Sequence, residues 1–381
     1  MTQTVLLGDV CRYVNDKVLV DEILLNNYVS TENLIPDKGG LCIATKLPQS
    51  GKITHFKKGD VLVSNIRPYF KKIWFADRNG GASNDVLVFR PTVDSLYSEY
   101  LYYILASDNF FSYSSTSSGG SKMPRGDKTQ IMKYPAVIPD FKTQKKIVSI
   151  LSSLDEKIEL NSKMNETLEQ IGQALFRHYF IDNPKAEGWK DVLIANPNIL
   201  EIIKPGIDRF NGEKYYIATA NVSGNYYVNN FEKITFEKRP SRANMQPISG
   251  SIWFSKMIGE HKALIIDDGD LGVLNSCIFS TGFMGIMPKE KYKYYVWCYV
   301  NSPYFAIQKN TLATGAVMVA LNNGSFSKIN IKLPTNGTLD TFNYQIENLY
   351  KNISLLSRET QTLARIRDTL LPRLISGKLQ I

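Results

Sequence analysis

The sequence predicts an α+β protein in which two related globular domains are separated by two long helices that pair with each other. Three patterns predict it: two amphipathic stretches half a chain apart, short β-type runs broken by turn residues, and the return of both patterns at nearly constant spacing. We expect globular domains at 1–139 and 187–334, a first helix with its linker at 140–186, and a second helix at 335–381. The chain is therefore expected to be a tandem duplication.

The two helical stretches run from Lys146 to Phe180 and from Phe342 to Ile375. Apolar residues recur every three or four positions in both, and stretches of this length are typical of a coiled coil. We expect the helices to pack on each other, and the alternative, that each packs only on its own domain, remains open. The residues predicted to form the contact are Leu151, Leu154, Ile158, Leu168 and Leu175 in the first helix and Ile346, Leu349, Ile353, Leu363 and Leu370 in the second.

Polar or small residues interrupt the apolar stripe of the first helix. Polar residues in a coiled-coil seam commonly fix register and partner choice at some cost in stability. We therefore expect these breaks to specify the pairing. They are Asn161, Asn165 and Gly172, where the second helix has Leu356, Thr360 and Arg367.

The globular domains repeat as well. Their β-type runs, such as Asp60–Asn65 and Asp85–Phe89, alternate in a way that predicts strands with one buried face. An aromatic-rich helix is expected over Ser98–Tyr113 and a linker over Ile181–Trp189. The segments that we align between the domains are Tyr28–Asn33 with Tyr216–Asn221, Gly59–Ile66 with Gly250–Met257, Asn84–Val88 with Asn275–Phe279, and Ser118–Met123 with Ala313–Met318.

Composition limits the classes of partner. The net charge of +9, from 45 Lys and Arg against 36 Asp and Glu, favours a polyanionic partner such as nucleic acid. Because the chain shows neither a secretory leader nor a run of about 18 apolar residues, we expect a cytoplasmic protein without a membrane span. The four cysteines form no CxxC pair, so reduced thiols and no metal site are expected.

With both repeats placed, the sequence resembles the specificity subunit of type I restriction-modification systems. No single motif is decisive, but the order of domain, helix, domain and helix is specific, and the resemblance covers essentially the whole chain. The segments that carry it are LGDVCRYVNDKV, YVSTENLIP, GDVLVSNIRPYFKKIWFA, GGSKMPRGDKTQIMKYPAVIP, LSSLDEKIELNSKMNETLEQIGQALF, RPSRANMQPISGSIWFSKM and RDTLLPRLISGKLQI.

This resemblance implies a non-catalytic subunit with pseudo-twofold symmetry. Each recognition domain would read one half of a bipartite, asymmetric site in double-stranded DNA, and the helices would pair antiparallel to set the gap. Two methyltransferase subunits would dock around them, and restriction subunits would join. S-adenosylmethionine would belong to the methyltransferase partner, which would receive the flipped adenine, and ATP and Mg to the restriction partner. This chain would hold no cofactor.

The helix length suits such a spacer. A helix of about 36 residues with a rise of about 1.5 Å per residue is about 54 Å long. At about 3.4 Å per base pair it spans roughly 16 base pairs, more than the one helical turn that places two half-sites on one face of the DNA.

DNA reading calls for basic and amide side chains on loops, because phosphate contacts position a protein and base-edge contacts specify the sequence. An exposed cation that only faces solvent remains the alternative for any one residue. The first-domain candidates are Arg67, Tyr69, Lys71, Lys72, Lys122, Arg125 and Lys128, with Ser30, Thr31 and Asn33 as weaker ones; the second-domain candidates are Arg239, Ser241, Arg242, Lys256, Lys262, Asn322 and Asn323.

Four aromatic residues, Tyr69, Phe70, Trp74 and Phe75, lie among these cations. Aromatic residues in a strand pattern are more often core, so we expect packing and keep stacking on bases as the alternative.

A search for an active site finds no phosphate-binding GxxxxGK[ST] loop and no GxSxG elbow. Asp155, Glu156 and Lys157 resemble a nuclease-like acidic pair with a lysine, but their place on a helix predicts a solvated face. Two further readings stay open: a DNA methyltransferase or nuclease with its own active site, and a coiled-coil scaffold without a DNA role.

Overall fold

The computed structural model describes residues 3–116, 123–227, 231–315, 319–379 and 381. It divides into two compact units: unit 1 comprises Met1–Asn161 with Arg358–Ile381, and unit 2 comprises Ser162–Ser357. Each unit therefore contains one predicted globular domain and a part of each long helix, α5 (Phe141–Phe176) and α10 (Asn336–Ile375).

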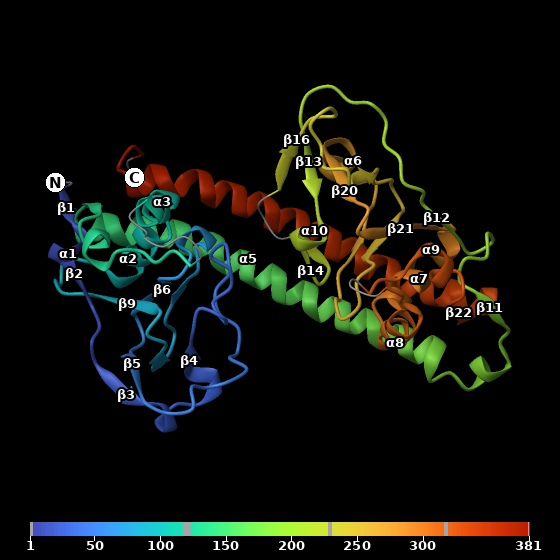
Figure 1. Cartoon of the computed structure of the whole chain (residues 1–381), viewed down its shortest axis with the longest axis horizontal. Coiled ribbons are helices and arrows are strands. Elements are labelled where there is room, and N and C mark those ends of the chain that lie inside the picture. Colours follow the sequence, from blue (N-terminus) through green and yellow to red (C-terminus); the bar gives the residue numbers. More distant parts are fainter. Residues whose placement is uncertain (1–2, 117–122, 228–230, 316–318, 380) are drawn as a thin grey trace. The chain divides into compact units, whose positions relative to one another are not determined.

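Unit 1 is built on two four-stranded sheets, drawn in blue shades in Figure 1. The first sheet is antiparallel, with the order β2 (Cys11–Tyr13), β9 (Val86–Pro91), β6 (Val61–Ser64), β7 (Ile73–Phe75). The second has the order β3 (Lys17–Leu19), β5 (Lys52–Phe56), β8 (Gly80–Ala82), β4 (Tyr28–Val29), and its β4–β8 pair is parallel. A separate ribbon joins β1 (Gln3–Leu6) to β10 (Pro135–Ile138).

The core of unit 1 lies between its first sheet and its helices. All four residues of β6 are buried, as expected for an apolar run with both faces covered. The covering helices are α2 (Ser98–Leu105), α3 (Asp108–Thr116) and the first part of α5; α1 (Leu7–Val10) and α4 (Lys128–Ile131) are single turns. Leu371, Leu374 and Ile375, from the end of α10, complete this core.

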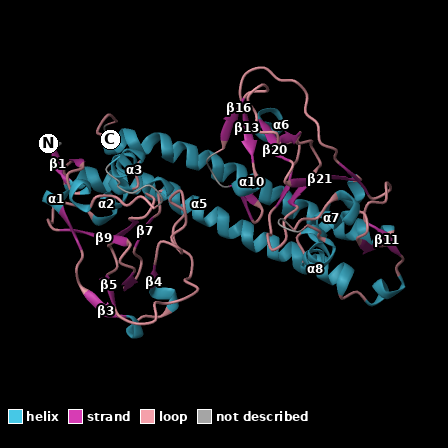
Figure 2. Cartoon of the chain, in the orientation of Figure 1, coloured by secondary structure: helices cyan, strands magenta, loops and turns pink. Residues whose placement is uncertain are grey.

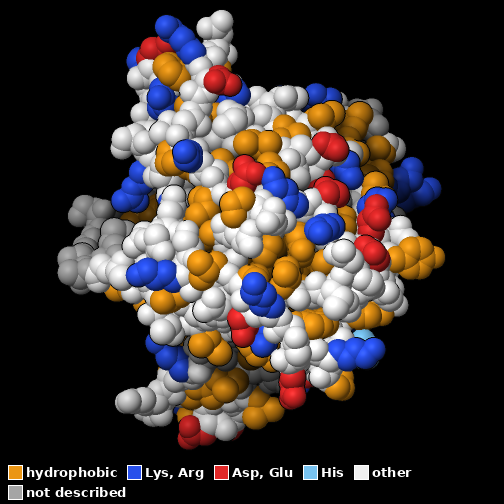
Figure 3. Space-filling view, turned by 90° about the vertical axis from the view of Figure 1, so that its right-hand side faces the viewer, with side chains coloured by type: hydrophobic (Ala, Val, Ile, Leu, Met, Phe, Trp, Pro, Cys, Tyr) orange, Lys and Arg blue, Asp and Glu red, His pale blue; other side chains and the backbone are white. Residues whose placement is uncertain are grey.

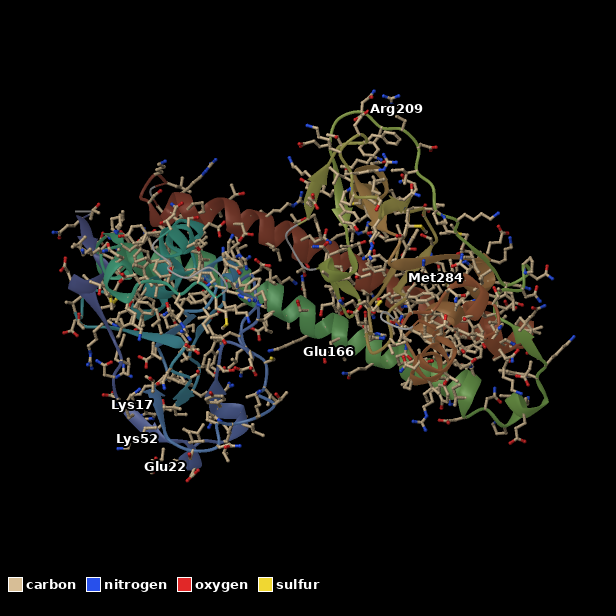
Figure 4. All side chains as sticks on the ribbon, viewed as in Figure 1. Lys17, Glu22, Lys52, Glu166, Arg209 and Met284 are labelled. Atoms are coloured by element: carbon tan, nitrogen blue, oxygen red, sulfur yellow. The ribbon has the colours of Figure 1, made fainter. Side chains whose placement is uncertain are left out.

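Unit 2 repeats the plan. Its antiparallel sheet has the order β12 (Leu200–Ile202), β21 (Phe283–Pro288), β18 (Ile252–Ser255), β19 (Ala263–Ile265), and Met284 of β21 lies inside the core (Figure 4). The second sheet has the order β16 (Glu232–Ile234), β13 (Lys214–Ile217), β20 (Cys277–Ser280), β17 (Ala243–Met245). Two ribbons join β11 (Asp191–Leu193) to β22 (Asn330–Lys332) and β14 (Val222–Ser223) to β15 (Tyr226–Tyr227). The shorter helices, cyan in Figure 2, are α6 (Leu271–Ser276), α7 (Lys293–Val300), α8 (Pro303–Leu312) and α9 (Asn323–Phe326).

The first sheets have matching strand orders and the second sheets share three strands with one parallel pair, which confirms the predicted duplication with one correction. The alignment of Asn275–Phe279 with Asn84–Val88 is wrong. Strand β20 pairs in parallel with β13, as β8 does with β4, whereas the counterpart of β9 is β21. A short apolar run after an asparagine fits either strand, and only the pairing partners decide between them.

Three predicted boundaries also change. The Asp140 carboxylate accepts hydrogen bonds from Thr143, which allows α5 to begin earlier than expected. Ser107 accepts a hydrogen bond from the Phe110 amide and so divides the predicted helix Ser98–Tyr113 into α2 and α3. The predicted linker is packed, because it forms a 3₁₀ turn at Pro184–Gly188 and buries Trp189.

Candidate nucleic-acid interface

Two predicted DNA-reading segments of unit 1 meet at the connection from β6 to β7. Ile66 and Arg125 form an isolated bridge. The Arg67 amide donates to the Pro124 carbonyl at 2.8 Å, and the Gly126 amide donates to the Asn65 carbonyl at 3.2 Å. Backbone hydrogen bonds therefore place Arg67 and Arg125, far apart in sequence, on neighbouring strands of one surface.

A third segment, which the sequence reading missed, joins this surface. The Asp37 amide donates to the Phe70 carbonyl at 2.8 Å, and the Lys38 amide donates to the Lys71 carbonyl at 2.9 Å. We call Asp37, Lys38, 67–72 and Arg125 the basic ridge. The PDKGG turn in the sequence was the available signal, since such residues tolerate unusual backbone angles.

The backbone of the basic ridge is strained. Asp37, Lys38, Arg67 and Lys71 have φ values of 54°, 63°, 50° and 51°, and they are the only non-glycine residues with positive φ in the described part of the chain. Left-handed backbone disfavours a side chain and persists only where the surroundings hold it. Such conformations cluster at functional sites.

The cations of the basic ridge are held by neighbouring groups. The Nζ atoms of Lys38 and Lys71 lie 3.1 and 2.9 Å from one carboxylate oxygen of Asp108. Burial alone would raise the pKa of Asp108, but these two lysines outweigh it and lower that pKa. The Lys72 ammonium donates to the Thr31 carbonyl, and burial lowers its pKa.

The remaining first-domain candidates differ in accessibility. Arg125 is exposed and pairs with Asp85 at 3.0 Å, and Lys128 is exposed at the start of α4. Ser30 and Thr31 are half-buried. Asn33 is only 5% exposed, and its amide nitrogen donates to two carbonyls within its own turn, so the structure does not support it as a DNA contact. Lys122 lies outside the described residues.

The aromatic residues divide into two pairs. Trp74 and Phe75 are half-buried and pack against the cores of unit 1, as expected. Tyr69 and Phe70 are 51% and 38% exposed, so the expectation that they pack in the core is wrong. They occupy a 3₁₀ turn, Pro68–Phe70, whose flanking residues Arg67 and Lys71 carry two of the left-handed backbones.

Unit 2 reproduces the backbone frame of this site. Met257 bridges Ala320, the Leu321 amide donates to the Lys256 carbonyl at 2.8 Å, and the Ile258 amide donates to the Val319 carbonyl at 3.4 Å. These contacts occupy the positions of the Ile66, Arg125 and Arg67 contacts in unit 1. Asn322 caps α9 by accepting from the Ser325 amide at 2.9 Å, and Asn323 beside it is exposed.

The cations of unit 2 are placed differently. Lys256 donates to the Thr281 carbonyl at 2.9 Å, and burial lowers its pKa. Lys262 pairs with Glu260 at 3.2 Å. Ser241 and Arg242 are exposed, and the Arg242 carbonyl accepts from the Thr281 amide, which brings this loop beside Lys256. Arg239 instead lies over the Phe236 ring, 4.0 Å from its centroid.

In unit 1 the paired helices meet through a polar layer. The Arg367 guanidinium lies 2.9 Å from the Asp155 carboxylate, which also accepts from the Tyr103 hydroxyl at 2.8 Å. Burial lowers the pKa of Arg367, but Asp155 and Asp368 outweigh it and raise that pKa. Asp155 is therefore part of the helix contact, and the expectation of a solvated face is wrong for it. The buried Asn161 donates to Glu359 at 2.8 Å.

In unit 2 the helices meet at a second set of interrupted positions. The buried Asn165 donates to the Ser357 hydroxyl at 3.0 Å, and a Cβ atom on Gly172 would lie 2.9 Å from the Tyr350 hydroxyl. In each unit, residues later in α5 contact residues earlier in α10, so the two helical segments run antiparallel. Mutual packing is confirmed, and each helix also packs on its own domain. Of the predicted contact residues, Leu151, Ile346, Leu349 and Ile353 are buried, while Leu154, Ile158, Leu168, Leu175, Leu363 and Leu370 are half-buried.

Charge on the face shown in Figure 3 is mixed, with cations scattered among apolar and acidic side chains. None of the helices among the described residues is long and apolar enough to cross a membrane. Within that same part of the chain, no three His, Cys, Asp or Glu residues are grouped so that they could hold a metal ion.

Comparison with known proteins gives consistent relatives. Residues 2–170 match the family described as type I restriction modification DNA specificity domain. The HindI specificity subunit of Haemophilus influenzae is 24% identical, with 98% of each chain aligned. The MjaIX specificity subunit of Methanocaldococcus jannaschii is also 24% identical, over 94% of this chain and 85% of that protein.

A solved structure shows the same fold. The type I restriction-modification S subunit from M. genitalium matches 98% of this chain and 96% of its own with a TM-score of 0.56 at 13% identity. The family match lies in the first repeat, and the relatives extend along nearly the whole duplicated chain. The first repeat thus matches the type I DNA specificity domain, and nearly the whole chain is similar to type I specificity subunits.

Proposed function

We propose that this chain reads DNA sequence for a type I restriction-modification complex and performs no catalysis itself. The basic ridge of unit 1 and the equivalent loops of unit 2 would each contact one half of a bipartite site in double-stranded DNA. The observation that carries this proposal is one backbone frame built twice, at Ile66–Arg125 and Met257–Ala320, with different side chains on it. A repeated frame with different side chains suits two readers of different half-sites.

The helices would set the gap between the half-sites. Polar contacts at Asp155–Arg367 and Asn165–Ser357 would favour one register, because a shift of either helix would separate both pairs. A fixed register would give a fixed spacing. Contacts on bases would come from the exposed members of the predicted set, and phosphate contacts from the lysines.

Two methyltransferase subunits would dock on this scaffold, and restriction subunits would join them in the cytoplasm. S-adenosylmethionine would be bound by the methyltransferase subunits, and ATP and Mg by the restriction subunits. The restriction and methylation chemistry would therefore depend on partners that this chain positions on DNA.

Methylation sequencing of the host genome with and without the gene tests the proposal. We expect methylated adenines in one bipartite asymmetric motif that disappear when the gene is deleted. An unchanged methylation pattern would contradict it. Methylation of DNA by the purified chain with S-adenosylmethionine alone would favour an enzyme instead.

The spacer role has its own test. One heptad is deleted between Leu154 and Leu168 together with a matched heptad between Leu349 and Leu363, so that both helices shorten equally. Selection from randomised DNA should return both half-sites unchanged with a different gap. Replacing residues 1–139 by those of a relative should change one half-site only. An unchanged gap after the heptad deletion would exclude the ruler.

A further inference from the structure

The tip of the basic ridge presents two large aromatic rings to solvent. Tyr69 and Phe70 have ring centroids 4.8 Å apart and are 51% and 38% exposed. Arg67 lies 6.0 Å from the Phe70 centroid, and lysines follow at 71 and 72. An exposed aromatic pair between cations is unfavourable in water unless a partner covers it.

The turn that carries these rings is rigid. Pro68 fixes one backbone angle, and two hydrogen bonds close the turn, from the Phe70 amide to the Arg67 carbonyl at 2.9 Å and from the Lys71 amide to the Pro68 carbonyl at 2.8 Å. Backbone bonds from Asp37 and Lys38 hold its far side. A rigid aromatic group loses little conformational entropy when it binds.

Asp108 braces the turn from α3. Its carboxylate binds Lys71, which ends the turn, and Lys38, whose side chain is 13% exposed. The brace therefore links two segments of the basic ridge, the aromatic turn and the 37–38 segment, to helix α3.

We propose that the Pro68–Phe70 turn is a preformed aromatic wedge that inserts Tyr69, backed by Phe70, between base pairs of the half-site read by unit 1. This inference rests on the proposed function. Apolar wedges unstack base steps in other DNA-binding proteins, and flanking cations would hold the adjacent phosphates. The cations at both ends of the turn favour DNA over a protein partner as the group that covers the rings.

Unit 2 lacks such a wedge. The corresponding connection runs Met257–Lys262 and holds no pair of large aromatic rings, since its one ring is the exposed imidazole of His261. Its Glu260 is tied to Ser255 at 2.9 Å and to Lys262 at 3.2 Å. The distortion of DNA would therefore be confined to the half-site of unit 1.

The test uses the full chain with its methyltransferase subunits and duplexes that carry the motif found by methylation sequencing, with 2-aminopurine placed at each position in turn. Wild-type complex should raise 2-aminopurine fluorescence at one step of the unit 1 half-site, beyond the signal of the flipped base. Tyr69→Ala with Phe70→Ala should abolish this rise and weaken site binding by about 5- to 150-fold, the range expected for losing a stacked ring. Tyr69→Phe should retain both.

Tyr344→Ala, which removes an 82% exposed ring from α10, is the matched control and should change neither signal. Equal fluorescence and affinity in the wedge variant would overturn the wedge. If the wedge variant fails to assemble with the methyltransferase subunits in the absence of DNA, the proposal is also overturned, because the rings would then contact a protein. If the wild-type complex fails to prefer the motif over random DNA, the proposed function fails, which separates the two outcomes.

Discussion

In both units a short helix holds the connection between two strands, but the side chain that does so is an anion in unit 1 and a cation in unit 2. In unit 1, the helix α3 offers the carboxylate of Asp108, which binds Lys71 of the β6–β7 connection and Lys38 of the 37–38 segment. In unit 2, α8 offers Lys309, whose ammonium donates to the Glu260 carbonyl of the β18–β19 connection at 3.0 Å. The comparison is close, because Ser107 and Ser302 cap the two helices in the same way. Backbone hydrogen bonds fix the frame that both units share, whereas the charged side chain that holds each loop differs between them.

The largest expected effect is on DNA binding, where removal of cations should matter more in the loop of unit 1 than in the loop of unit 2. Arg67→Ala with Lys71→Ala should weaken binding to the site by about 100-fold and reduce the slope of log affinity against log salt by about 2, one for each lost phosphate contact. Lys256→Ala with Lys262→Ala should change the slope by less than about 1, because Lys256 is half-buried against the Thr281 carbonyl and the Lys262 side chain is only 20% exposed beside Glu260. Fluorescence anisotropy across a salt series measures both. Equal changes in slope for the two double variants would contradict the expectation that the unit 1 loop makes more phosphate contacts.

A matched pair of asparagines tests the common frame. Asn33 accepts from the Ser30 amide at 2.6 Å, and Asn221 accepts from the Ala218 amide at 2.9 Å in the equivalent turn. Asn33 also donates to two carbonyls and is buried, so Asn33→Ala should lower the free energy of unfolding by about 2 kcal/mol and Asn221→Ala by about 1 kcal/mol. Urea denaturation compares them. A larger cost at Asn221 would contradict the ranking.

Lys309 gives unit 2 a pH dependence in the alkaline range. Burial lowers the pKa of Lys309 to about 8 from its ordinary 10.5. Between these values the unfolded chain binds a proton that the folded chain does not, so the free energy of unfolding should rise with pH across this window. Lys309 should contribute about 2 kcal/mol to the rise from pH 7.5 to 9.5, and Lys309→Met should remove that contribution. Thermal unfolding at a series of pH values measures this rise, with Lys328→Met, at an exposed lysine, as the control. If Lys309→Met shows the same rise as wild type, a group other than Lys309 causes it.

The smallest expected effect concerns the acidic brace. Asp108→Asn removes an exposed negative charge from the basic ridge and releases Lys71 toward phosphate. Affinity for random duplex DNA should increase about threefold, and preference for the motif should fall. Asp94→Asn, at another exposed carboxylate of unit 1, should leave both unchanged. Weaker binding to random DNA in Asp108→Asn would contradict a restraining role.

Much of the architecture followed from the sequence because periodicity records burial. The buried positions Leu151 and Ile346 and the buried polar breaks at Asn161 and Asn165 lie where the pattern placed them. The alignment of Asn275–Phe279 with Asn84–Val88 was wrong, because apolar residues occur in every strand and do not indicate which strands pair.

The candidate site was less accessible to sequence reasoning. Arg67 and Arg125 were chosen for their charge and do meet, but the PDKGG turn at Asp37–Lys38 signals only a bend, and the backbone contacts that add it to the basic ridge come from the fold. Asn33 was chosen for its amide, which the fold uses internally. Exposure of Tyr69 and Phe70 follows from two left-handed residues, and neither is a glycine that would have signalled the turn.

The core of unit 1 takes Leu371, Leu374 and Ile375 from the far end of α10, whereas unit 2 is one continuous segment, Ser162–Ser357. During synthesis, the domain made first must therefore wait until residues 371–375 have left the ribosome, and the domain made second can close before it. A chain broken off before residue 371 would present one finished reader and one with an open apolar surface, a form that chaperones and proteases would recognise.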